Sequence, residues 1–161
     1  MNTALIASVI LAVYIMTACI ANRSIPESIS QLVKDLATAG VWLWSTVMIL
    51  TAVLTLPAAL DAACENTQFL AFISCAALVF MAVTPLVNNT SHISYTVHMA
   101  SAYTSAAASQ LLVLLNCPWL LILWVPFFIF WYVFSQRRSF PWKFWSETTC
   151  FVITLIFSTL F

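Results

Sequence analysis

The strongest constraint on this chain is a run of 71 residues, Asn66–Gln136, that contains no Asp, Glu, Lys or Arg. As one straight helix this run would be about 107 Å long, far longer than the hydrocarbon core of a bilayer is thick. The run therefore has to fold back on itself. Two polar breaks supply the turns, one at Val87–His92 after Pro85 and one at Asn116–Pro118.

The composition of the whole chain indicates the solvent around it. Hydrophobic residues make up 63% of the 161 residues and charged residues only 6%, whereas roughly a quarter of a soluble domain is charged. A surface so poor in charge suits lipid. The net charge of zero gives no attraction to nucleic acid. Because the sequence has no linker, low-complexity tract or repeat, we expect residues 1–161 to form one integral membrane domain.

Six apolar segments predict an all-α, polytopic membrane helical bundle with six transmembrane helices. The first segment follows Met1-Asn2, which carries no basic side chain, so we interpret it as a retained helix and not as a signal peptide. The six predicted spans are Thr3–Ala21, Leu36–Leu60, Gln68–Leu86, Ile93–Leu115, Pro118–Phe134 and a shorter one, Trp145–Phe161.

Basic residues predict the orientation of these spans, because cytoplasmic loops collect Lys and Arg. With six spans, every basic residue falls in or beside the first or the fifth loop, and these two loops lie on the same side of the membrane. Asp61 and Glu65 then lie in the second loop, on the opposite side. We therefore expect both termini outside. The basic residues are Arg23, Lys34, Arg137, Arg138 and Lys143.

Tryptophans mark the predicted membrane interfaces. Six of the seven, Trp44 among them, lie at or near span ends, where the indole ring stays in lipid and its N–H reaches the headgroups. Trp124 instead belongs to a very aromatic fifth span. We expect that span to face lipid or a partner subunit.

The segment between the first two spans has the features of an amphipathic helix. Ser24-Ile25-Pro26-Glu27 has the form of a capping box with proline in the first turn. Apolar residues then recur at helical spacing up to Leu36, with Glu27 and Lys34 on the opposite side. We interpret the segment as an interfacial helix along the inner membrane surface. A cytoplasmic extension of the second span is the alternative.

Polar side chains cluster on one face of the fourth span. Small residues at a spacing of four allow close helix packing, and serine hydroxyls can bond across such a contact. This predicts a helix-packing seam. His98 on the same face is an ionisable group near the inner surface, and such groups usually face a protein interior or a wet cavity. Gln110 lies away from this face and is a candidate bridge to another helix. The seam comprises Ser101, Ala102, Ser105 and Ser109.

No motif predicts a metal, a cofactor or a hydrolase site. His92 and His98 are six residues apart and so do not share a helical face, and no C-x-x-C spacing accompanies them. The chain contains a single glycine, so it has no phosphate-binding loop and no G-x-S-x-G. Cys64 and Cys117 both reach the predicted outer face, where a disulfide between them is conceivable.

Several local patterns resemble a group of small multi-pass membrane proteins of gut Bacteroidetes that have no assigned activity. They are Ser24–Ser30, Gln68–Phe72, Ala82–Pro85, Val97-His98 and Ser109–Leu111. A proline-ended third span followed by a histidine early in the fourth is also similar to Frag1/DRAM-type membrane families. The resemblance implies a helical bundle in a bacterial inner membrane, and it directs attention to the region around Ser24–Ser30 and His98.

Three hypotheses for function follow. The first is a membrane-embedded binding or transport-type protein with a polar ligand site near the inner surface, lined by Ser24, Glu27, His98 and Ser101. The second is a structural or regulatory subunit that holds a membrane-protein partner, or another copy of itself, through the aromatic fifth helix. The third is an intramembrane enzyme acting on lipid or quinone, with His98 as acid or base and Glu27 or Asp35 as the nearest carboxylate.

Overall fold

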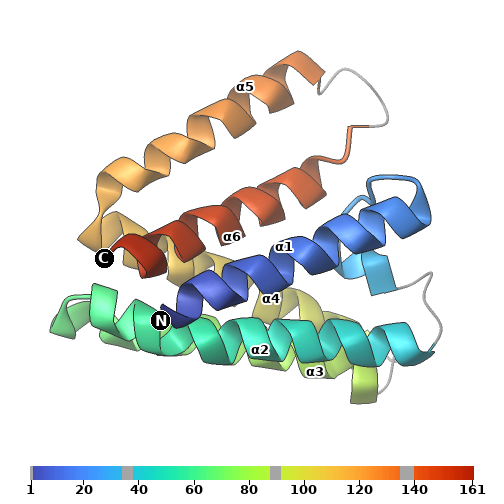
Figure 1. The fold of residues 1–161 in the computed structure, drawn as a ribbon, viewed down its shortest axis with the longest axis horizontal. Helices are drawn as coiled ribbons and strands as arrows, with labels where there is room; N and C mark the ends of the chain where they lie inside the picture. Colours follow the sequence, from blue (N-terminus) through green and yellow to red (C-terminus); the bar gives the residue numbers. More distant parts are fainter. Residues whose placement is uncertain (1, 34–37, 88–91, 135–139) are drawn as a thin grey trace.

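The computed structural model describes residues 2–33, 38–87, 92–134 and 140–161, and these residues contain six α-helices and no strand. Successive α-helices run antiparallel, so that both termini lie at one end of the bundle (Figure 1). The α-helices are α1 (Thr3–Asn22), α2 (Thr38–Ala62), α3 (Gln68–Val87), α4 (His92–Asn116), α5 (Trp124–Phe134) and α6 (Trp142–Leu160). Three 3₁₀ segments accompany them: η1 (Ile29–Val33), η2 (Glu65–Thr67) and η3 (Pro118–Leu123).

The six helices match the six predicted segments in number and order. Three of them are long and apolar enough to cross a membrane: Thr3–Ala21, Gly40–Ala62 and Glu65–Thr84. The last helix begins at Trp142, three residues before the predicted start, and reaches 19 residues. The prediction of six helices is therefore confirmed, and three of them meet the length and hydropathy of a span.

The fifth predicted segment differs from a single α-helix. It begins as η3 and continues as the 11 residues of α5. Pro118 is the first residue of η3, and Pro126 lies in the first turn of α5. At these positions the backbone N–H that proline lacks would have no hydrogen-bond partner within the same helix. The two prolines thus explain why the conformation changes within the segment.

The segment before α2 also differs from the prediction. Its helical part is the five-residue η1, which starts at Ile29 and not at Ser24. The backbone N–H of Ile29 donates to the Glu147 carboxylate of α6 at 2.7 Å, and the N–H of Phe144 donates to the Glu27 carbonyl at 2.8 Å. The Glu27 N–H, which a capping box would pair with Ser24, donates to the Gln31 side chain at 3.2 Å. The later part of the predicted helix, with Lys34 and Asp35, lies outside the described residues.

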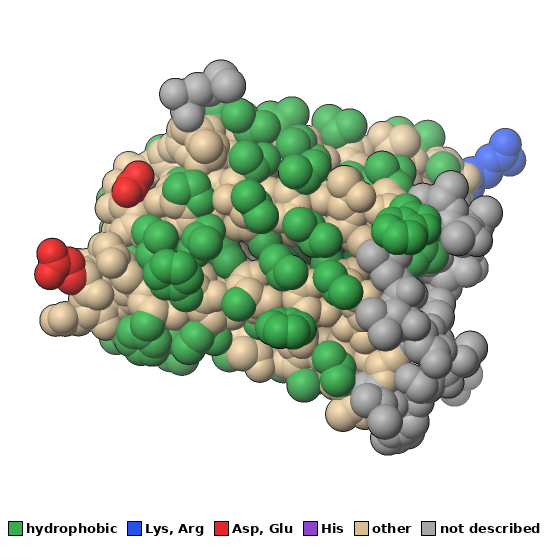
Figure 2. Space-filling model, turned by 90° about the horizontal axis from the view of Figure 1, so that it is seen from below, with side chains coloured by type: hydrophobic (Ala, Val, Ile, Leu, Met, Phe, Trp, Pro, Cys, Tyr) green, Lys and Arg blue, Asp and Glu red, His purple; other side chains and the backbone are tan. Residues whose placement is uncertain are grey.

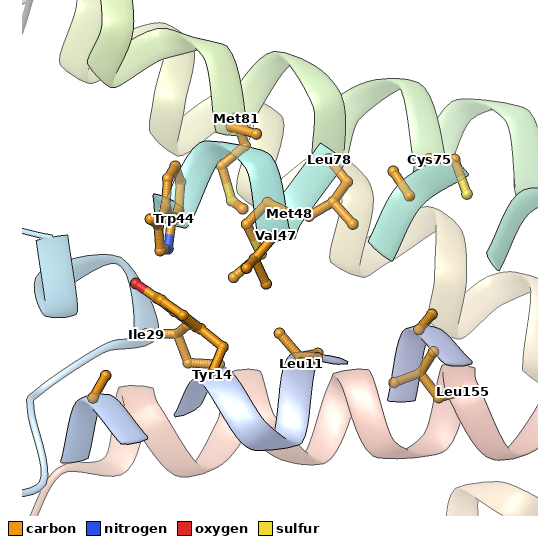
Figure 3. Packing of buried hydrophobic residues seen from close by; sticks show 14 of the residues in the cluster. Leu11, Tyr14, Ile29, Trp44, Val47, Met48, Cys75, Leu78, Met81 and Leu155 are labelled. Atoms are coloured by element: carbon orange, nitrogen blue, oxygen red, sulfur yellow. The ribbon is translucent and has the colours of Figure 1, made fainter. Parts of the chain in front are cut away.

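Two groups of buried side chains hold the bundle together. One group joins α1, α2 and α3 to the inner side of α6, and Figure 3 shows Leu11 and Leu155 facing Met48 and Leu78 across it. The other group joins α2, α3, α4 and α6 at the end nearer the termini, around Leu112 and Phe157. Helix α5 contributes no buried residue and lies at the edge of the bundle, beside α6 (Figure 1).

The outer surface is apolar between two charged ends. Figure 2 shows hydrophobic side chains across the middle of one face, acidic side chains at one end and basic side chains at the other. Asp61 lies in the last turn of α2 and Glu65 starts η2, on the side of the termini. Arg23 follows α1 and Lys143 lies in the first turn of α6, at the far end. We call the far end the basic end.

Candidate functional site

A cavity of about 570 Å³ lies inside the bundle between α2, α3, α4 and α6. Its volume is within the range of small-molecule sites. The walls come from all four helices and are mainly apolar, although the hydroxyl side chains of Thr51, Thr55, Ser74 and Ser105 also line them. The apolar side chains include those of Met48, Ala52, Leu78, Met81, Ala102 and Phe151. Larger polar side chains lie at the two ends of the cavity.

Toward the basic end, the cavity is lined by Trp44 and His98, whose ring centroids are 6.0 Å apart. The His98 Nδ1 lies 3.2 Å from the Met81 carbonyl oxygen of α3. A carbonyl oxygen can only accept, so this bond places a proton on Nδ1. Trp44 is fully buried, and its indole N–H has no hydrogen-bond partner.

At the basic end the cavity is lined by α6 and by the start of η1. Ser30, Lys143 and Glu147 line it together with Trp142. The Lys143 ammonium lies 5.7 Å from the centre of the Trp142 ring, a cation–π distance. The Glu147 carboxylate is bound to the Ile29 N–H, and so this end of the cavity has both a cation and an anion already held in place.

The deep end of the cavity is closed by Gln110, which joins three helices. Its Nε2 donates to the Cys150 carbonyl and to the Thr154 hydroxyl of α6, each at 3.3 Å. Its Oε1 accepts the indole N–H of Trp124 at 2.9 Å. The expected bridge from Gln110 to another helix is confirmed. The expectation that the fifth helix faces lipid or a partner is corrected for Trp124: its ring is half-buried and its N–H points toward the bundle, where Gln110 accepts it.

The serines of α4 make contacts with two different helices. Ser105 donates to the Ser74 carbonyl of α3 at 2.9 Å, and Ser74 donates to the Ser105 carbonyl at 3.1 Å. The hydroxyl of Ser109 donates to its own helix at Ala106 and lies 3.6 Å from the Cys150 sulfur of α6. Ala102 packs beside the first buried group and lines the cavity. Ser101 is half-buried and does not line it.

Three buried polar atoms among the described residues have no hydrogen-bond partner: the Trp44 indole nitrogen, the Thr55 hydroxyl and the Tyr14 hydroxyl. Trp44 and Thr55 line the cavity, and Thr55 is only 5% exposed. A buried polar group without a partner costs about 1–3 kcal/mol. Both atoms are themselves buried, so neither the Trp44 N–H nor the Thr55 hydroxyl is exposed to the cavity.

The four residues of the predicted ligand site do not come together. His98 lines the cavity, but Ser24 and Glu27 are exposed and lie outside its lining, as does Ser101. The Glu27 carboxylate instead accepts from the Gln31 side chain at 3.1 Å. No described carboxylate is bonded to His98. An acid–base role of His98 would need such a partner, and the described residues do not supply one.

Sequence reasoning missed Trp44, Thr55 and Glu147. Trp44 was expected at the membrane interface, yet it is buried in the core because it lies on the inward face of α2. Glu147 is the only carboxylate inside the last predicted span. A single carboxylate in an apolar span could have marked it as a residue with a partner inside the bundle. Thr55 carries no signal in the sequence that separates it from the other small residues of α2.

The described residues contain no group of three His, Cys, Asp or Glu side chains that could hold a metal ion. All five cysteines are free thiols, including Cys64 and Cys117. No family model matches the chain, and comparisons with curated proteins and with solved structures gave no match. The resemblance to the Bacteroidetes proteins stays a prediction.

Proposed function

We propose that this chain is a six-span inner-membrane protein that binds a small membrane-soluble molecule in the cavity between α2, α3, α4 and α6, as a binding or transport-type protein does. The observation that carries the proposal is the 570 Å³ cavity itself, whose walls are mainly apolar and include the polar side chains of His98 and Gln110. A ligand with an apolar body and a polar group suits such walls.

The lengths of the remaining helices support six spans. The six residues of η3 at about 2.0 Å and the eleven of α5 at about 1.5 Å together extend about 28 Å, close to the bilayer core. Helix α6 is of similar length and α4 is longer. Polar groups in these two helices, such as Gln110, bond inside the bundle, which lowers the cost of placing them in lipid.

The charge at the two ends supports the orientation. Arg23 and Lys143 lie at the basic end, and Asp61 and Glu65 at the end with the termini. By the positive-inside rule the basic end faces the cytoplasm, and both termini face outward. The end of the cavity that Lys143 lines then faces the inner surface.

Native mass spectrometry of the protein released from lipid nanodiscs tests ligand binding. We expect a fraction of the wild-type protein to carry a bound small molecule or lipid. Ala102→Phe should abolish the adduct, because Ala102 lines the cavity and a phenyl ring would fill it. Ala100→Phe is the matched control, since Ala100 is exposed on the same helix and lies outside the cavity lining. Adducts that persist equally in both variants would contradict a ligand in this cavity.

A second candidate function rests on α5. This helix has no buried residue, and its exposed side chains include Phe128, Phe130, Trp131 and Tyr132. Such a face suits a structural or regulatory subunit that holds a membrane-protein partner. Purification in mild detergent discriminates the subunit function from ligand binding. The subunit function is supported if a second protein co-purifies in stoichiometric amount and is lost when these four residues are replaced by leucine. A chain that purifies alone in both forms contradicts it.

A further inference from the structure

We infer that the molecule bound in this cavity is a phospholipid with an ethanolamine headgroup. The headgroup lies at the basic end between Lys143 and Glu147, and one acyl chain extends along the walls toward Gln110. The inference rests on the proposed function and adds the chemical class of the ligand. It depends on the charges at one end of the cavity, on the length of its walls and on its access from the lipid.

Lys143 places a positive charge at the basic end of the cavity. Its side chain is exposed and lines the cavity. Among the described residues its ammonium contacts the Trp142 ring and forms no ion pair. An ammonium has three N–H donors, so Lys143 still has donors to offer to a phosphate group.

Glu147 places a negative charge one helical turn further along α6. It follows Lys143 by four residues, a rise of about 6 Å, so the two side chains lie on the same side of the helix. One carboxylate oxygen of Glu147 accepts from the Ile29 N–H at 2.7 Å. The other oxygen has no hydrogen-bond partner among the described residues and can accept from an ammonium group.

A headgroup with both charges is complementary to this pair. Phosphoethanolamine carries a phosphate, which pairs with Lys143, and a primary ammonium, which donates to Glu147. A phosphoglycerol headgroup has no cation, so it sets its negative charge beside the Glu147 carboxylate with nothing to balance it. A phosphocholine headgroup has a cation but no N–H to donate.

The walls of the cavity match one acyl chain in length. Lys143 and Thr154 line its two ends and are eleven residues apart on α6, a distance of about 16 Å. One leaflet contributes half of the hydrocarbon core, or about 15 Å. A chain whose headgroup lies at the basic end therefore ends near Gln110, whose amide is already bonded to Trp124 and to α6.

Residues that line the cavity are also exposed on the outer surface beside α4 and α6. Tyr103 lines the cavity and is 68% exposed. It precedes Gln110 by seven residues and so shares the face of α4 from which Gln110 bonds α6. Trp142 of α6 lines the cavity and is exposed as well. A lipid can thus enter sideways between these two helices, while its second acyl chain stays in the bilayer.

Three probe lipids with the same two acyl chains test the inference on the wild-type protein: a phosphatidylethanolamine, a phosphatidylglycerol and a diacylglycerol. Each is added at the same mole fraction to nanodiscs of phosphatidylcholine, and native mass spectrometry measures how much of each the released protein retains. We expect phosphatidylethanolamine to be enriched at least about tenfold over either other probe, because each of these lacks at least one of the two charged contacts. This comparison requires no substitution, so it stands even where a variant fails to fold.

Charge variants then locate the headgroup. Glu147→Gln keeps an oxygen acceptor for Ile29 but removes the negative charge, so it should bring the retention of the two phospholipids to near equality. Lys143→Gln should reduce the enrichment of both phospholipids over diacylglycerol. Arg23→Gln and Glu27→Gln are the matched controls, since both residues are exposed at the same end and lie outside the cavity lining. They should leave all the ratios unchanged.

A variant of the wall locates the acyl chain. Ala102→Phe should abolish the enrichment of phosphatidylethanolamine, because the phenyl ring takes the place of the chain, whereas the exposed Ala100→Phe should retain it. Enrichment that persists in Ala102→Phe would overturn the chain in the cavity. Equal retention of the three probes by the wild-type protein, or a preference for phosphatidylglycerol, would overturn the ethanolamine site while leaving a ligand-binding cavity. Absence of any lipid preference, together with an adduct that Ala102→Phe does not remove, would overturn the proposed function itself.

Discussion

The carboxylate of Glu147 and the backbone N–H of Ile29, 118 positions apart in the sequence, form a hydrogen bond of 2.7 Å. Ile29 is the first residue of η1, and its N–H has no partner within that helix. Glu147 therefore caps η1 from α6, and both residues line the same end of the cavity. The nearby bond from the Phe144 N–H to the Glu27 carbonyl fixes the same two segments.

The Glu147 cap predicts a loss of stability on its removal. We expect Glu147→Ala to lower the free energy of unfolding by about 1–2 kcal/mol, because a partly buried N–H loses a charged acceptor. Glu147→Gln keeps an oxygen acceptor and should lose less. Glu27→Ala is the control, since the Glu27 side chain is exposed and its carboxylate bonds the nearby Gln31 side chain. Reversible unfolding in mixed SDS micelles measures all three, and equal losses in Glu147→Ala and Glu27→Ala would contradict the cap.

The contact between Ser74 and Ser105 predicts that the free energy of unfolding depends strongly on the size of the side chain at position 105. The two residues exchange hydrogen bonds between hydroxyl and carbonyl across α3 and α4. Ser105→Ala should cost about 0.6 kcal/mol, the typical worth of such a bond between membrane helices. Ser105→Leu should cost about 1–3 kcal/mol more, because a larger side chain separates the helices.

Thr104→Leu supplies the control for this contact, since Thr104 neighbours Ser105 but is exposed. It should change the free energy of unfolding by less than about 0.5 kcal/mol. The same SDS titration measures it. If Ser105→Leu proved as mild as Thr104→Leu, the close packing of α3 on α4 at this point would be refuted.

The number and approximate limits of the helices were predictable because each depends on a local property of the sequence. Long apolar runs and the break at Asn116–Pro118 determine where helices begin and end. The change from η3 to α5 was not predicted, although Pro118 and Pro126 gave a local signal for it. The helix predicted to start at Ser24 starts at Ile29, whose N–H is capped by Glu147, a residue distant in sequence.

The candidate site was less predictable, because it depends on how helices are rotated about their axes. Helix α2 is apolar on nearly all sides, so its sequence does not say which side faces the core. Trp44 was thus assigned to the interface. His98 could be singled out, since one ionisable residue in an apolar span is rare. Its contact with Trp44 needs α2 and α4 to pack on α3 in particular rotations, which no local pattern encodes.

The unpartnered hydroxyl of Thr55 predicts that its removal does not lower the free energy of unfolding. Thr55→Val keeps the shape and removes a buried polar group that has no partner, so we expect the free energy of unfolding to stay equal or to rise by about 1 kcal/mol. Ser45→Ala is the contrasting variant, because the buried Ser45 hydroxyl donates to the Ala82 carbonyl at 2.7 Å. It should lower stability by about 1 kcal/mol. A Thr55→Val protein less stable than Ser45→Ala would show that Thr55 has a partner after all.

The position of Cys64 allows the proposed orientation to be tested in cells. Cys64 is the only one of the described cysteines that is classed as exposed, and it lies between α2 and η2, on the side assigned to the outside. A membrane-impermeant maleimide should therefore label Cys64 in intact cells. If the cells have an outer membrane, it is made permeable first. Cys64→Ala should abolish the label. A cysteine introduced as Lys143→Cys into the Cys64→Ala protein should react only after the inner membrane is opened, because α6 begins at the basic end. Labelling of both positions from the same side would exclude six spans. Labelling of the cysteine at position 143 from outside, with Cys64 reached only from inside, would reverse the orientation and retain the six spans.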